Sequence, residues 1–193
     1  MQYKKKYIND KILEAGLAEY LDKGYRQGNI STIAQSAGVP VGNLYRYFDG
    51  KAGLLDALVK DVYLEIPKTI EKLARFFAEK AGLSVVEVLE HLANSLSEVF
   101  ERNGRQIVIL ADKCATTRYE DFIDKIVAQI GELVFRLLYV EEKREDRLMS
   151  TLTARAFVHS LLDVLRLNLE CAEAKSMVLR ILKFYFYEIG SRK

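Results

Sequence analysis

Proline is scarce in this chain, with two in 193 residues, and there are only eleven glycines. Both residue types interrupt helices, so their scarcity favours long helices with few breaks. Half of the residues are apolar, which is enough to bury a core, and the length suits one or two small domains. We found no β-hairpin signal and no internal repeat, and we expect an all-α fold.

Cysteine is rare as well. Cys114 and Cys171 form no CxxC motif and belong to no dense His/Cys cluster, which argues against a disulfide scaffold or a structural zinc site. Neither sign of charge prevails, because 29 basic and 27 acidic residues leave a formal charge of +2. Any surface that binds a polyanion must therefore be local.

Long hydrophobic runs are also missing. No apolar stretch approaches the ~20 residues that cross a bilayer, and the polar start MQYKKKYINDK has no signal-peptide core. We therefore expect a soluble cytoplasmic protein that makes no use of a membrane. We also expect no cofactor and no metal.

The segment over residues 30–51, ISTIAQSAGVPVGNLYRYFDGK, has the pattern of two short helices joined by a tight turn. Gly38 can adopt the positive φ that ends the first helix, and Val39 fills the angle between the two. Apolar positions give each helix a buried side: Ile33, Ala34 and Ala37 in the first, and Leu44, Tyr45 and Phe48 in the second, which we expect over residues 40–48. This is the layout of a helix-turn-helix, whose second helix enters the major groove of DNA.

The residues around this segment predict where its neighbours begin and end. Gly24 is expected to close a helix over residues 7–23, and Asn29 is a good N-cap for the helix that follows it. Asp49 can cap the next helix, which we expect to end at Pro67, because proline cannot donate to the helix ladder.

Beyond Pro67 the apolar spacing predicts further helices, and Ser84 with Glu87 has the S-x-x-E form of a capping box. The expected helices cover residues 68–80, 84–102, 105–113, 121–140, 147–170 and 172–189, with a loop over 114–120 and a surface turn over 141–146.

Two stretches, ILEAGLAEYLDKGY and ISTIAQSAGVPVGNLYRYFDGKAGLL, resemble the TetR family of one-component bacterial repressors. The family pattern has an alanine pair and an aromatic in the first helix, a Gly-Tyr exit, an IA-xx-AGV turn, a G-x-LYxYF recognition helix and a lysine that opens the fourth helix. Nearly every element is present here, far more than in a bare helix-turn-helix pattern. The resemblance ends near Leu55, and the rest of the chain matches only in being helical and of suitable length.

The chain departs from this pattern at several positions. Gly16 replaces the second alanine, and Glu19 stands where a leucine is usual, so Leu17 or Leu21 is expected to supply the missing packing. Pro40 takes the place of a hydroxyl N-cap, although proline suits the first turn of a helix. None of these departures removes an expected DNA contact.

Groove geometry and the resemblance together select the candidates for DNA contact: Ser31, Thr32, Val41, Gly42, Asn43, Tyr45, Arg46, Tyr47 and Lys51. Asn43 suits adenine, Arg46 suits guanine, and Val41 suits a thymine methyl group. Tyr47 and Lys51 are expected at phosphates.

Some of these assignments have a competing interpretation. The spacing of Tyr45 and Phe48 favours a place in the core over a contact. Arg46 is equally consistent with an ordinary solvated residue. The cluster Lys4–Lys6 suits a flexible arm near the minor groove, although such clusters are more often solubilising tails.

The last two expected helices are apolar on more than one side, and a helix of that kind must bury a second face. In the family this face forms a four-helix interface, so the resemblance implies a homodimer through the last two helices. Burial of both faces inside one subunit is the alternative. Two recognition helices would also read two half-sites, which one short helix cannot do.

The resemblance also implies an effector pocket in the middle helices. The expected lining residues are Phe76, Phe77, His91, Ser95, Phe100, Leu110, Cys114, Tyr119, Phe122 and His159. Any single one of them is more often plain core, His91 is expected to be exposed, and His159 is expected to be buried and hydrogen-bonded. The apolar and aromatic set suits a hydrophobic or amphipathic small molecule.

We therefore expect a homodimeric repressor that binds double-stranded operator DNA and is released by a small ligand. Its parts would be a helix-turn-helix domain over residues 1–50, a connecting helix over 51–67 and an effector-binding and dimerisation domain over 68–193. The alternative is a constitutive or architectural DNA-binding protein without an effector. An enzyme is disfavoured, because the chain offers no nucleophile–base spacing, no metal constellation and no phosphate loop.

Overall fold

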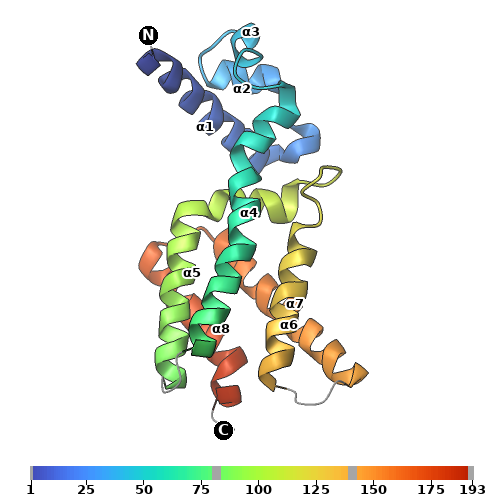
Figure 1. The fold of residues 1–193 in the computed structure, drawn as a ribbon. Coiled ribbons are helices and arrows are strands. Elements are labelled where there is room, and N and C mark those ends of the chain that lie inside the picture. Colours follow the sequence, from blue (N-terminus) through green and yellow to red (C-terminus); the bar gives the residue numbers. More distant parts are fainter. Residues whose placement is uncertain (1, 80–83, 139–142, 191–193) are drawn as a thin grey trace. The chain divides into compact units, whose positions relative to one another are not determined.

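The computed structural model describes residues 2–79, 84–138 and 143–190, and the side chains of residues 2–4, 77–78, 137–138 and 188–190 lie outside the description. Within these ranges the chain is helical, as expected (Figure 1). The elements are α1 (Gln2–Gln27), α2 (Ile30–Ser36), α3 (Val41–Leu44), α4 (Gly50–Glu79), α5 (Val85–Val108), the π-helix η1 (Ile109–Lys113), α6 (Phe122–Leu138), α7 (Arg144–Arg166) and α8 (Cys171–Gly190). None of these helices is both long enough and apolar enough to span a membrane.

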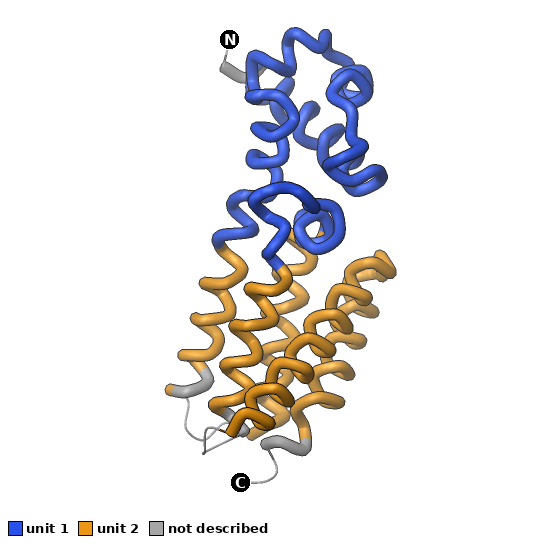
Figure 2. The backbone as a smooth tube through the Cα atoms, turned by 90° about the vertical axis from the view of Figure 1, so that its right-hand side faces the viewer, with its two compact units in different colours: residues 1–64, 105–122 blue, residues 65–104, 123–193 orange. Residues whose placement is uncertain are grey.

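The helices form two compact units (Figure 2). Unit 1 contains residues 1–64 and 105–122, so the end of α5 and all of η1 belong with the helix-turn-helix. Unit 2 contains residues 65–104 and 123–193. Both α4 and α5 have residues in each unit. The three-part division expected from the sequence remains a prediction.

In unit 1, α1 packs closely on α4 at Gly16. A Cβ at this position would lie 2.9 Å from Leu54 Cδ2, so the absence of a side chain lets the two helices approach. Leu17 is buried and supplies the packing that the sequence led us to expect. Gly24 ends the regular part of α1 with a φ of 73° and a ψ of 169°.

The predicted helix end at Pro67 is wrong, because α4 continues through this residue to Glu79. Proline within a helix removes one backbone hydrogen bond and costs about 3 kcal/mol. Two side-chain hydrogen bonds to backbone carbonyls lie at and beside Pro67. Gln129 Nε2 donates to the Pro67 carbonyl at 2.9 Å, and Thr69 Oγ1 donates to the Glu65 carbonyl at 2.9 Å.

The predicted break before Arg105 is also wrong, since α5 runs unbroken to Val108. Gly104 serves packing there, because a Cβ would lie 3.1 Å from Leu165 Cδ2 on α7. The start of α5 is as predicted. The Ser84 N–H donates to Glu87 Oε2 at 2.8 Å and the Glu87 N–H donates to Ser84 Oγ at 3.3 Å, which makes a reciprocal capping box.

The core of unit 2 is built from α5, α7 and α8. Its buried residues are Leu89, Ala93, Phe157, Leu161, Val164, Val178 and Leu182. The last two helices begin at Arg144 and Cys171, where the sequence predicted 147 and 172. Part of the predicted turn over 141–146 lies outside the described residues, and residues 144–146 already belong to α7.

Gly38 and Gly42 form a matched pair for testing the turn. Both have open space where a Cβ would be, but only Gly38 has a positive φ, of 67°. We expect Gly38→Ala to lower the free energy of unfolding by about 1 kcal/mol, because L side chains strain the left-handed region. Gly42→Ala should leave it unchanged or raise it by up to about 1 kcal/mol, since alanine favours helix. Urea denaturation of both variants makes the comparison, and equal effects would contradict it.

Candidate nucleic-acid interface

The first helix of the motif, α2, is capped as predicted. Asn29 is extended, with a φ of −122°, and its Oδ1 accepts from the Ser31 N–H at 2.7 Å. Ile33 and Ala34 are fully buried. The turn then closes at Gly38, whose N–H donates to the Gln35 carbonyl at 3.0 Å. Tight backbone bonding therefore fixes the angle at which the chain leaves α2.

The recognition segment is shorter as a regular helix than predicted. α3 covers Val41–Leu44, and Pro40 is its N-cap without a side-chain hydrogen bond. Helical hydrogen bonds nevertheless continue, because the N–H groups of Tyr47 and Phe48 both donate to the Leu44 carbonyl at 3.0 Å. Residues 41–48 thus form a compact helical segment, with Leu44 and Phe48 buried.

The candidate DNA residues lie in unit 1, and most of them are accessible. Tyr45 is 59% exposed, so its predicted place in the core is wrong, whereas that of Phe48 is right. Ser31, Val41, Gly42 and Arg46 are exposed as well, while Thr32, Asn43, Tyr47 and Lys51 are half-buried. No contact with DNA follows from exposure alone, and the assignments remain predictions.

Lys51 has partners inside the protein. Its Nζ donates to the Arg26 carbonyl at 2.9 Å and lies 4.9 Å from the centre of the Tyr25 ring. The backbone carbonyl of Lys51 also accepts from the Tyr20 hydroxyl at 3.0 Å. An ammonium group has three donors, so this lysine can hold the end of α1 and still donate to a phosphate.

The expected flexible arm is not observed. Lys5 and Lys6 are exposed residues of α1, which begins at Gln2, and the side chain of Lys4 lies outside the description. Helical geometry fixes the direction in which these two lysines project from unit 1.

The expected ligand-pocket residues are divided between the two units. Leu110, Cys114, Tyr119 and Phe122 are buried in unit 1; Phe76, His91, Ser95, Phe100 and His159 belong to unit 2, and the side chain of Phe77 lies outside the description. His91 is exposed as expected and stacks on Phe76 with 4.8 Å between ring centres. His159 is exposed, so its predicted burial is wrong. Position 159 faces outward from α7, whereas Phe157, Val158 and Leu161 face the interior.

The four unit 1 residues are part of the buried core of that unit. The Tyr119 hydroxyl donates to Asp56 Oδ1 at 2.8 Å, and Arg118 donates to Asp56 Oδ2 at 2.7 Å. Burial raises the pKa of the Cys114 thiol to about 11, so it stays protonated near neutral pH. A protonated thiol is a poor nucleophile, which disfavours catalysis through Cys114.

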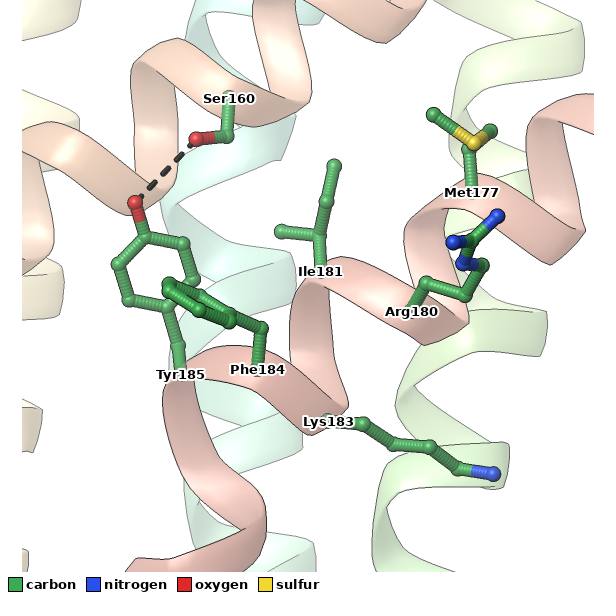
Figure 3. A pocket seen from close by; sticks show the side chains of 7 residues that line it. All are labelled: Ser160, Met177, Arg180, Ile181, Lys183, Phe184 and Tyr185. Carbon is green, nitrogen blue, oxygen red and sulfur yellow. Dashed lines mark hydrogen bonds between the residues drawn. The ribbon is translucent and has the colours of Figure 1, made fainter.

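A surface depression of about 540 Å³ lies along α7 and α8, and none of the expected lining residues is among those that line it (Figure 3). Ser160 lines it from α7, and Met177, Arg180, Ile181, Lys183, Phe184 and Tyr185 line it from α8. The hydroxyls of Ser160 and Tyr185 are 3.3 Å apart and hydrogen-bonded. Phe184 beside them is 84% exposed. No group of His, Cys, Asp and Glu residues within the described ranges could hold a metal ion.

Sequence reasoning missed the contacts that hold the loop before α2. Glu19, noted only as a departure from a leucine pattern, is buried and its carboxylate binds Asn29 and Lys23. The sequence did carry a signal, since Glu19 is a charged residue at a position of α1 that faces the core. A charged side chain is rarely buried without a partner, so hydrogen bonds to Glu19 could have been expected.

Comparison with known proteins agrees with this geometry. Residues 12–58 match the family model "Bacterial regulatory proteins, tetR family". The chain is 27% identical over 161 residues to the probable HTH-type transcriptional regulator YttP of Bacillus subtilis, covering 81% of this chain and 74% of that protein. In fold it is similar to SmeT in its complex with triclosan, with a TM-score of 0.59, 19% identity and coverage of 94% and 90%. It is also similar to FadR from Bacillus subtilis in complex with stearoyl-CoA, with a TM-score of 0.50, 21% identity and coverage of 90% and 97%.

Proposed function

We propose that this chain, which belongs to the TetR family of bacterial regulatory proteins, is a homodimeric repressor that binds operator DNA and is released from it by a small amphipathic ligand. The helix-turn-helix geometry of residues 29–48 carries this proposal. Its recognition segment buries Leu44 and Phe48 and leaves Val41, Tyr45 and Arg46 exposed. A surface of this kind can enter a major groove without disturbing the core.

In this proposal side chains of residues 41–46 read bases, and residues around them bind phosphates. Val41, Asn43 and Arg46 contact base edges, with Gly42 allowing close approach of the backbone. Tyr45, Tyr47 and Lys51 contact one phosphate backbone, and Ser31 and Thr32 contact the other. No group on this surface is arranged for catalysis, and we propose no enzymatic activity.

Arg46 is the residue whose substitution tests base reading. We expect Arg46→Ala to weaken binding to a selected operator by about tenfold to a hundredfold, because a bidentate arginine–guanine pair contributes about 1–3 kcal/mol of discrimination. Arg46→Lys keeps the charge but loses the bidentate fork, so it should bind non-specific DNA normally and the operator weakly. The wild-type protein first selects fragments from genomic DNA, and fluorescence anisotropy then measures each variant. Arg75→Ala, at an exposed position of α4, is the control. Unchanged operator binding by folded Arg46→Ala would contradict the assignment.

The dimer is supported by the apolar surface of α8. Phe184 is 84% exposed and Tyr187 is 50% exposed, on the helix that also lines the depression in Figure 3. Large exposed aromatics beside an apolar depression are typical of protein–protein interfaces. We propose that α7 and α8 pair with the same helices of a second copy, which places two recognition segments about one DNA turn (~34 Å) apart.

Phe184→Glu tests the interface. We expect the wild-type protein to have twice the mass of one chain by light scattering, and Phe184→Glu to have the mass of one chain, because a carboxylate buried at the interface would lack a partner. Val86→Glu is the matched control, since Val86 is also an exposed apolar residue but lies on α5. A dimer that persists in Phe184→Glu, or a monomeric wild-type protein, would contradict the proposal.

The ligand class is inferred from two solved structures of similar fold that hold a ligand. FadR of Bacillus subtilis binds stearoyl-CoA and SmeT binds triclosan, and both ligands carry large apolar parts. The half-buried aromatics of unit 2, Phe76 and Phe100, are compatible with such a ligand. We propose that a ligand bound among the middle helices shifts the position of α4, whose residues belong to both units. This shift would change the distance between the two recognition segments of the dimer.

Stearoyl-CoA is therefore the first probe for release. We expect it to weaken operator binding about 5- to 150-fold, the range of a coupling free energy of about 1–3 kcal/mol. Titration into the complex with labelled operator measures the release, with free coenzyme A as the control for the head group. Ligand binding by calorimetry without loss of DNA would contradict the switch and favour the alternative, a constitutive regulator.

A further inference from the structure

Glu19 is a buried carboxylate that is bonded to Lys23 of its own helix and to Asn29, the N-cap of α2. It is 8% exposed, on the α1 face that packs inward. Its Oε1 accepts from the backbone N–H of Asn29 at 3.0 Å, and both its oxygens accept from Lys23 Nζ at 3.1 Å. A buried carboxylate is stable only when it is bonded in this way, so these contacts define its role.

The bond to Asn29 completes a capping box in an unusual way. In a local capping box the residue at the third helical position reaches back to the N–H of the N-cap, as Glu87 does for Ser84 in α5. In α2 that third position is Thr32, and the acceptor for the Asn29 N–H is Glu19 of the preceding helix. The capping box of α2 is therefore completed by a tertiary contact, which ties its N-cap residue, Asn29, to α1.

The loop between the two helices is held at further points. Gly28 lies against the Tyr20 ring, where a Cβ would be 2.8 Å from two ring carbons, and its N–H donates to the Gly24 carbonyl at 2.9 Å. Lys51 Nζ donates to the Arg26 carbonyl from α4. Glu19 supplies the last of these anchors before α2 begins, so the direction of α2 relative to α1 depends on it.

We propose that Glu19 is a positioning residue for DNA binding. Its hydrogen bond from the Asn29 N–H fixes the orientation of α2 relative to α1. The orientation of the recognition segment, which follows α2, is fixed with it. The proposal rests on the proposed DNA-binding function. In this proposal the length of the Glu19 side chain matters and its charge does not, because the neutral amide oxygen of a glutamine can accept a hydrogen bond from the same Asn29 N–H. It gives a role to a carboxylate at a position where leucine is usual in the family pattern.

Three substitutions of Glu19 separate the effects of its side-chain length, its charge and its volume on DNA binding. Glu19→Gln keeps the reach and loses the charge, so it should bind operator within about threefold of wild type. Glu19→Asp keeps the charge but is one methylene shorter, and it should lose affinity at least tenfold. Glu19→Leu keeps an apolar fit without an acceptor, and it should lose affinity to a similar extent while its thermal midpoint stays at or above that of wild type.

Operator affinity is measured by fluorescence anisotropy, and folding by circular dichroism and thermal unfolding. Glu14→Leu is the matched control, because Glu14 is also on α1 but is exposed and paired with Arg105 at 2.8 Å. It should bind DNA as wild type does. If Glu19→Leu does not fold, the comparison of Glu19→Gln with Glu19→Asp decides. Equal binding by those two folded variants overturns the proposal, as does wild-type affinity in a folded Glu19→Leu.

Failure of this inference is distinguishable from failure of the proposed function. If the wild-type protein selects no DNA from a genomic library, the repressor proposal fails. If the wild-type protein binds and the Glu19 variants all bind equally well, only the role of Glu19 fails. Amide hydrogen exchange adds a readout that needs no DNA: exchange at Asn29 should be slow in wild type and Glu19→Gln, and fast in Glu19→Asp.

Discussion

The contact on which unit 1 depends most is the burial of Tyr20 at the junction of α1, the loop after it and α4. This side chain is fully buried, its ring covers Gly28, and its hydroxyl donates to the Lys51 carbonyl at 3.0 Å. One residue thus satisfies a backbone acceptor at the start of α4 and fills the space beneath the loop. Because protein interiors are close-packed, removing such a side chain would loosen all three segments together.

The anchors around this junction give the helix-turn-helix a defined position on its own unit. η1 lies against the kinked end of α1, because the Lys113 side chain lies 3.6 Å from the position that a Cβ at Gly24 would take. Its neighbours in sequence, Cys114 to Phe122, are held to α4 by the Asp56 contacts of Arg118 and Tyr119. Residues far apart in the chain therefore contribute to the frame that carries the recognition segment.

Unit 2 has a different character. Its core of α5, α7 and α8 is buried, yet α8 leaves two large aromatic side chains and a depression at the surface. Exposed apolar surface of this kind often marks an interaction site, and the proposed pairing of α7 and α8 rests on it. The ligand-binding candidates do not share this surface. They divide between the units, and their place at a ligand remains a prediction.

The sequence by itself determined the features that depend on residues within about four positions of one another. The positive φ of Gly38 and the Asn29 cap are of this kind, and the helix-turn-helix pattern depends on them; the positive φ of Gly24 and the Ser84–Glu87 box are further local features. Only the tertiary structure decided the continuation of α4 through Pro67, the partners of Glu19 and the exposure of Tyr45 and His159. The physical reason is that local hydrogen bonds and steric limits are encoded in neighbouring residues. Burial and charge pairing are set by residues that only folding brings together.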